Sequence, residues 1–301
     1  MSLRRVLTRN LKILGVVLSI VFATLVVLVK TATAGLSVKV IVIGGLIPLP
    51  YNVDFINTVA LMLIALLTPL GVLARIEARR LKSIERTMPR FLDDLSEMVR
   101  AGVPMTRAFE ELAERDYGAL TRIIRRIATK VRVGVDLADA IEAEMKGLSP
   151  MTKRLLVMVA EAYRSGGRAA AVLREVSAFT RMLRLFEEER ERNLKVYRWI
   201  VYLAIMVFLA TSAVLLYLSE SIYEMSMLAG PGILRGFLTP EVLTGILYYT
   251  SIMVSLFSGF VIGKVTERRA MLGVPHVVAL LVMNMLFFNN MDLIMRLMPK
   301  L

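Results

Sequence analysis

The chain has 301 residues, 56% of them hydrophobic, with a mean hydropathy of +0.65 and a net charge of +13. It contains no cysteine, which excludes a disulfide framework and thiolate chemistry. A soluble domain spreads its apolar residues at helix or strand spacing, whereas this chain gathers them into uncharged blocks.

These blocks predict membrane-spanning helices. Four runs without a charged residue and a shorter fifth lie at about residues 13–29, 55–74, 199–219, 243–263 and 277–298. A helix needs roughly 20 residues to cross a bilayer core of about 30 Å. The fifth run reaches Met298 only if Asp292 and Arg296 lie at the lipid interface.

The first run also has a second interpretation. Basic residues, an apolar stretch and Ala32-Thr33-Ala34 together fit a cleavable signal peptide. The length of the stretch and the position of Lys30 favour an uncleaved anchor, and either choice leaves the later topology unchanged.

The basic residues predict the orientation in the membrane, because Lys and Arg collect on cytoplasmic segments. With the N-terminus in the cytoplasm, 33 of the 38 basic residues lie inside, 26 of them between Arg75 and Arg198. The high positive charge is therefore explained by topology, and nucleic-acid binding is not needed to account for it.

The polar segment between the second and third spans has helical periodicity throughout. Glycines and a proline mark its turns, at Gly102, Pro104, Gly134, Gly166 and Gly167. We expect an all-α polytopic membrane protein with four or five transmembrane helices and a cytoplasmic bundle of six helices made of three hairpins. The expected domains are residues 1–80, the bundle 81–198 and the C-terminal membrane region 199–301. The sixth helix has no breaker before Trp199 and is expected to continue into the third span.

An internal spacing recurs in this segment. Gly102, Gly134 and Gly166 follow one another at intervals of 32 residues, and an arginine stands two positions before each. Common ancestry and three hairpins of equal length both explain this register.

The catalytic motifs that we considered are absent from the sequence. Gly263-Lys264 is followed by valine, so the chain has no phosphate-binding loop, and His276 has no neighbouring ligands for zinc. We interpret the carboxylate pairs Asp93-Asp94 and Glu110-Glu111 as parts of solvated helix faces. We therefore expect no cofactor and no enzymatic activity.

The spans predict no transport pathway, because the four longer ones hold no ionisable residue. Asn284, Asn289 and Asn290 form a polar cluster in the fifth span. We interpret them as a packing or partner-contact face in preference to a conducting path.

One predicted helix of the bundle carries a basic stripe, consisting of Arg122, Arg125, Arg126, Lys130 and Arg132. Such a stripe is commonly solvated or faces anionic lipid. It is also a candidate for docking an acidic partner surface, because complementary charge provides steering and register.

Four stretches carry a resemblance to a known family. They are PRFLDDL (89–95), RAGVPM (100–105), AFEEL (108–112) and EAYRSGG (161–167). Within a chain of this span pattern, they resemble the F domain of type II secretion systems, which is shared by the platform proteins of type IV pili, archaella and tight-adherence pili. The resemblance extends over about Arg86 to Arg181. Many members carry two F domains, whereas one is found here.

The resemblance implies a non-enzymatic platform in the cell membrane, with the N-terminus and residues 75–198 in the cytoplasm. It implies a separate hexameric ATPase that docks on the cytoplasmic side, and the basic stripe is the candidate docking surface. It also implies pilin-like subunits that are drawn from the lipid. It also implies a second copy or a paralogue, and no nucleic-acid partner. The alternative interpretation is a component of a membrane transporter or channel without enzymatic activity. A third interpretation is a membrane peptidase, but the sequence lacks the paired membrane aspartates that such an enzyme needs.

Overall fold

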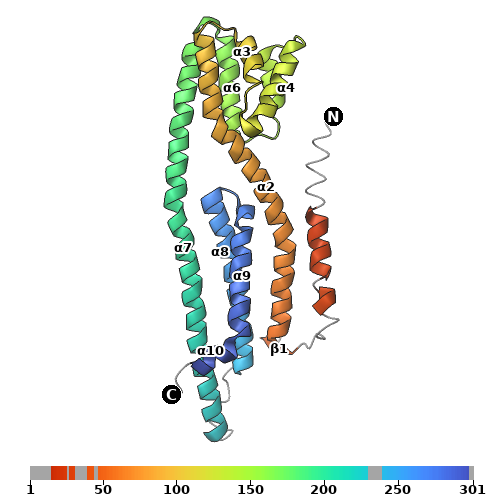
Figure 1. Ribbon diagram of the computed structural model, residues 1–301. Coiled ribbons are helices and arrows are strands. Elements are labelled where there is room, and N and C mark those ends of the chain that lie inside the picture. Colours follow the sequence, from red (N-terminus) through yellow and green to blue (C-terminus); the bar gives the residue numbers. More distant parts are fainter. Residues whose placement is uncertain (1–14, 26, 31–38, 44–46, 230–238, 298–301) are drawn as a thin grey trace. The chain divides into compact units, whose positions relative to one another are not determined.

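The computed structural model describes residues 15–25, 27–30, 39–43, 47–229 and 239–297, and these residues are almost entirely helical (Figure 1). The chain divides into two compact units. We call Arg75–Arg192 the helical unit, and Met1–Ala74 together with Asn193–Leu301 the membrane unit. The expected all-α class is confirmed, apart from one small β-hairpin.

Two long helices belong to both units. Helix α2 (Val53–Arg100) has 48 residues and α7 (Ala169–Ala229) has 61, which correspond to lengths of about 72 and 92 Å at a rise of 1.5 Å per residue. The side chain of Asn52 accepts a hydrogen bond from the Asp54 amide at the start of α2. Continuity into a span was expected for α7 alone, so the unbroken course of α2 through Pro69 and Pro89 is a finding of the structure.

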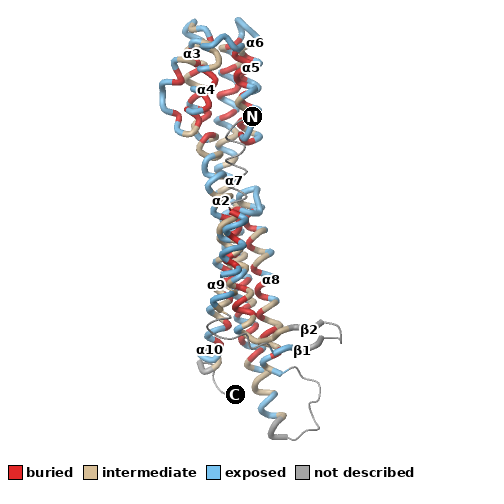
Figure 2. Tube along the Cα trace, turned by 90° about the vertical axis from the view of Figure 1, so that its right-hand side faces the viewer, coloured by how far each residue is buried: buried red, intermediate tan, exposed pale blue. Residues whose placement is uncertain are grey.

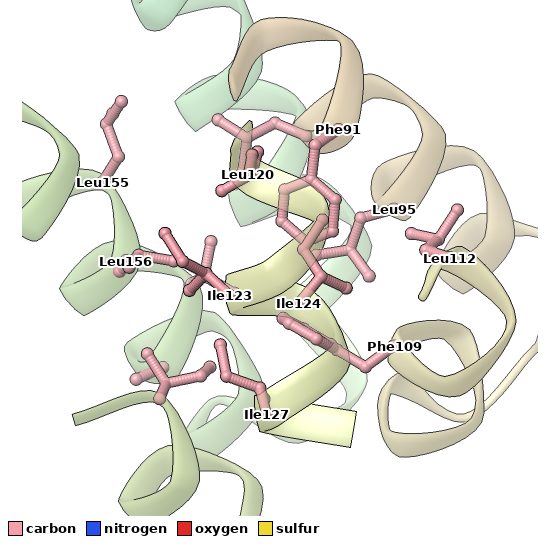
Figure 3. Packing of buried hydrophobic residues seen from close by; sticks show 14 of the residues in the cluster. Phe91, Leu95, Phe109, Leu112, Leu120, Ile123, Ile124, Ile127, Leu155 and Leu156 are labelled. Atoms are coloured by element: carbon pink, nitrogen blue, oxygen red, sulfur yellow. The ribbon is translucent and has the colours of Figure 1, made fainter. Parts of the chain in front are cut away.

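The helical unit is completed by four shorter helices, α3 (Met105–Leu112), α4 (Thr121–Arg132), α5 (Leu137–Glu144) and α6 (Pro150–Arg164), with 3₁₀ turns η1 (Gly118–Leu120) and η2 (Gly166–Arg168). Together with the adjoining parts of α2 and α7 they enclose one hydrophobic core (Figures 2 and 3). Phe91 is fully buried in it, with its ring edge-on to Phe109 at 5.5 Å and to Tyr117 at 5.6 Å.

Two of the three predicted hairpin turns have the same backbone. Gly102 and Gly134 have φ of +88° and +89°. In each turn the glycine amide and the following valine amide bond back to the preceding helix over three and five residues, which is the Schellman motif. The next helix then begins after Pro104 or Asp136. The third turn differs, because Gly166 has φ +60° and leads into η2, so the structural repeat covers two turns.

The membrane unit contains a second core formed by α2, α7, α8 (Pro240–Glu267) and α9 (Val274–Asn289). A turn at Arg268 and the 3₁₀ helix η3 (Ala270–Gly273) connect α8 to α9. Gly259 and Gly263 of α8 form a GxxxG pair that faces Gly273 and Val277. A Cβ atom built on Gly263 would lie 2.2 Å from the backbone nitrogen of Gly273, so the two backbones are in direct contact.

Four helical stretches in the described part are long and apolar enough to cross a membrane, namely Val53–Arg100, Gly166–Ser226, Pro240–Glu267 and Ala270–Asn289. The protein is therefore a multi-pass membrane protein. The boundaries predicted for the fifth span (277–298) are corrected: the helix begins earlier and ends at Asn289, and α10 (Met291–Leu297) follows separately. The predicted first span corresponds to a shorter apolar helix, Gly15–Lys30, which passes through position 26 outside the described residues.

A β-hairpin precedes α2. Strands β1 (Val40–Ile43) and β2 (Ile47–Pro50) are antiparallel, with Ile43 opposite Ile47. All four residues of β1 are β-branched, which favours an extended conformation. Lys39 forms an ion pair of 3.1 Å with Glu241 in the first turn of α8, which ties the hairpin to that helix. The ion pair raises the pKa of Lys39 above its ordinary value.

Candidate functional site

The basic stripe lies along α4, but two of its cations are bound to a carboxylate of the same unit. Arg126 Nε donates to Glu144 Oε2 at 2.6 Å, and Lys130 Nζ lies 3.0 Å from Oε1 of the same residue. Glu144 is the last residue of α5, and its side chain is only 14% exposed. Arg126 and Lys130 therefore brace α4 against the end of α5.

A third cation of the stripe closes the end of α3. Arg125 Nε donates to the carbonyl oxygen of Ala113 at 3.0 Å. Ala113 is the C-cap of α3, and the last carbonyls of a helix have no partner within the helix itself. Arg125 thus has a structural role, although its guanidinium remains partly exposed.

The remaining two cations, Arg122 and Arg132, are exposed and make no bond to any other described residue. They are ten residues apart on α4, which corresponds to about 15 Å along the helix axis. The stripe has five cations and Glu144 is the carboxylate paired with two of them, so the stripe itself keeps a positive charge. Arg122 and Arg132 are the residues on it that an incoming partner meets without breaking an internal bond.

The interpretation of Asp93-Asp94 as a solvated face is wrong. Asp93 Oδ1 accepts hydrogen bonds from the Ser177 hydroxyl and, at 2.6 Å, from Arg181 of α7. Asp94 Oδ2 accepts from the Tyr117 hydroxyl at 2.5 Å and from Arg115 at 3.2 Å. The pair therefore holds α2 against α7 and against the loop after α3. Glu111, by contrast, is exposed and pairs with Arg107 one turn away.

Tyr117 has a strongly raised pKa. Burial of the phenol is the main cause, and the hydrogen bond and negative charge of Asp94 add to it. The ring is 1% exposed, and Arg90 lies over it at 5.8 Å. These surroundings favour the neutral phenol, which is a hydrogen-bond donor and a core residue, and they give no sign of an acid–base catalyst.

A chain of polar groups connects three helices of the membrane unit. The Tyr248 hydroxyl of α8 donates to Asn57 Oδ1 of α2 at 2.5 Å, and Asn57 Nδ2 donates to Asn289 Oδ1 of α9 at 2.6 Å. Tyr248 and Asn57 are buried, whereas Asn289 is exposed. Hydrogen bonds of this kind hold helices together in lipid.

The other two asparagines of the predicted cluster have separate surroundings. Asn284 is fully buried, and its amide nitrogen donates to Ser255 of α8 at 2.9 Å, while its Oδ1 has no partner among the described residues. Asn290 is exposed and donates to the Leu286 carbonyl at the end of α9. The three asparagines therefore do not share one surface, and their role in partner contact stays a prediction.

The part of the chain that the structure describes holds no group of three or more histidine or carboxylate side chains placed to bind a metal ion. His276 lies at the start of α9, where its Nδ1 is 3.0 Å from the Tyr202 hydroxyl. This contact joins α9 to α7 within the membrane unit.

Comparison with known proteins gives a family match for part of the chain. Residues 91–217 match the family model described as type II secretion system (T2SS), protein F. An uncharacterized protein of Methanocaldococcus jannaschii is 27% identical over 208 residues, which are 68% of this chain and 33% of that protein. The chain thus spans about a third of the length of this relative. No solved structure matches the chain.

Proposed function

Because residues 91–217 match the family model of type II secretion system protein F, we propose that this membrane protein is the platform of a filament-assembly or secretion machine. The family match itself carries the proposal. It includes most of the helical unit and continues along α7 as far as Tyr217, within the apolar part of that helix. Because the family model includes both residues of the helical unit and the apolar part of α7, we expect these two parts to function together.

In the proposed mechanism the chain transmits work and hydrolyses nothing. A separate hexameric ATPase docks on the helical unit in the cytoplasm, and pilin-like subunits are drawn from the lipid beside the membrane unit. The excess of Lys and Arg between residues 75 and 198 supports the cytoplasmic orientation. Helices α2 and α7 each continue from an apolar stretch into the helical unit, so both are candidates for the transmitting element.

The positive face of α4 is the proposed docking surface for the ATPase. Arg122 and Arg132 are the test residues, because neither one has a bond within the described part of the chain that a substitution would break. Reversing Arg125 or Arg126 would also remove the bonds to Ala113 and Glu144, and a loss of docking would then be ambiguous.

The experiment compares two double variants of the full-length membrane protein. Arg122→Glu/Arg132→Glu is expected to reduce co-purification of the ATPase about tenfold, because each reversal replaces attraction by repulsion. Lys153→Glu/Arg154→Glu, on an exposed part of α6, makes the same change of charge elsewhere and is expected to bind normally. Normal binding by the α4 variant, with both proteins inserted in the membrane, would contradict this docking surface.

A further inference from the structure

Helix α7 has one face that neither hydrophobic core covers. Its buried side chains, among them Leu173, Thr180, Leu209 and Leu216, lie on one side of the helix. At about 100° per residue, the opposite side carries Phe179, Met182, Phe186, Val196, Ile200 and Leu203. These six side chains are 47–61% exposed. We call this set the α7 seam.

The α7 seam has the spacing of a coiled coil. Its members follow each other at intervals of three and four residues once Glu189 and Asn193 are counted between Phe186 and Val196. In heptad notation, residues 179, 186, 193 and 200 take position a, and residues 182, 189, 196 and 203 take position d. The same spacing continues through Val207 to Val214, and both of these are exposed as well. A repeat of 3.5 residues sustained over five heptads predicts a left-handed pair of helices.

Lipid does not account for the first half of this seam. The uncharged span begins at Trp199, and Phe186 precedes it by 13 residues, or about 20 Å along the helix. Phe179, Met182 and Phe186 are therefore exposed on a stretch that is otherwise rich in Arg and Glu. Large contiguous apolar patches on a polar surface mark interaction sites.

The polar positions of the seam indicate what covers it. Asn193 at position a is a residue that fixes register and favours two strands, since two such asparagines can bond to each other. Glu189 at position d is flanked by Arg190 at e and Arg192 at g. In a parallel pair each Glu189 lies opposite Glu189 of the other copy and beside that copy's Arg190, whose charge offsets the repulsion between the two carboxylates. Ile200 and Val207 at a with Leu203 at d also favour two strands.

We propose that α7 pairs in parallel with α7 of a second copy of this chain along the α7 seam. Two copies inserted with the same topology have parallel α7 helices, and in a parallel pair each layer of the seam meets the same layer of the other copy. A seam from Phe179 to Val214 is about 53 Å long, which is enough for an interface of standard size, about 800 Å² per partner. The proposal does not depend on the platform function, because it rests on α7 alone.

Cysteine cross-linking tests this directly, because the natural chain has no cysteine. Single variants Met182→Cys, Phe186→Cys and Val196→Cys are made in the full-length protein and oxidised in native membranes. Disulfide formation requires Cβ atoms about 4 Å apart, so these positions are expected to give a product of twice the chain's mass. Glu188→Cys and Lys195→Cys, at exposed c positions of the same helix, are the matched controls and are expected to cross-link about tenfold less.

A second measurement guards against trapping by random collision. The reporter Val196→Cys is combined with Phe186→Glu, about 15 Å away along the helix. This change places two carboxylates opposite each other with Leu185, and no arginine, at the adjoining g position, so cross-linking is expected to fall about tenfold. Insertion of each variant is verified by its resistance to extraction with alkaline carbonate. Equal yields at seam and control positions, no yield at any position, or a product whose mass shows a different partner protein would each overturn the proposal.

Discussion

Tyr117 donates a hydrogen bond of 2.5 Å to Asp94, and Arg115 donates to the same carboxylate oxygen at 3.2 Å. Tyr117 also packs edge-on against Phe91. Two neighbouring residues of α2 therefore contact Tyr117: Phe91 packs against its ring in the core, and Asp94, one turn further along the helix, accepts a hydrogen bond from its hydroxyl.

The variant Tyr117→Phe keeps the ring and removes the hydroxyl. Because Asp94 retains Arg115, we expect the free energy of unfolding to fall by about 1 kcal/mol. The wild-type protein should also lose stability as the pH rises above 10, the ordinary pKa of tyrosine, since the unfolded phenol ionises there while the folded one stays protonated. The stability is fully present below that pH, and the part of the alkaline loss due to Tyr117 should vanish in the variant.

The measurement is thermal unfolding of the full chain in detergent at several pH values between 7 and 11. Tyr223→Phe, at an exposed position of α7, is the control and should behave as wild type. An alkaline loss that is unchanged in Tyr117→Phe would assign it to other groups and contradict the prediction.

Glu144→Gln tests the brace between α4 and α5. Arg126 and Lys130 would both lose their anion, and we expect a loss of about 1–2 kcal/mol, because these two cations are still about one-third exposed. The control is Glu142→Gln, whose side chain is 55% exposed and pairs with Arg164. It should cost less than about 0.5 kcal/mol. Hydrogen exchange of the α4 and α5 amides reports the difference, and equal protection in both variants would show that the brace is not stabilising.

Gly263→Ala tests the contact between α8 and α9. The new methyl group would meet the backbone of Gly273, which cannot move aside without shifting the helix. We expect a loss of about 1–3 kcal/mol and a lower unfolding temperature of the membrane unit. Gly167→Ala is the matched control, since a Cβ atom there meets nothing within 4 Å. If both variants melt alike, the backbones of α8 and α9 are not in the close contact described.

Much of the helical unit could be predicted from the sequence because its helices are strongly amphipathic. The apolar positions of α4, Ile123, Ile124 and Ile127, are buried as their spacing indicates. The turns at Gly102 and Gly134 are equally local, because a glycine with positive φ ends a helix whatever surrounds it.

The errors arose where distant segments meet. Asp93 looks solvated in the sequence, but its partners Ser177 and Arg181 lie more than 80 residues away. Arg126 looks like a free cation, but Glu144 belongs to the next helix. Pro89 disfavours a helical residue before it, yet the core around Met88 and Phe91 keeps α2 continuous. The local sequence shows which face of a helix is apolar. Whether a polar side chain on the other face meets solvent or a partner residue depends on tertiary packing.

The glycine contact between α8 and α9 limits how the membrane unit can change shape. Because no side chain separates the two backbones at this contact, a rotation of one helix would bring it against the other. We therefore expect α8 and α9 to move together, and a rearrangement of the membrane unit to occur where they meet α2 or α7. There, hydrogen bonds such as that between Tyr248 and Asn57 can open and close again.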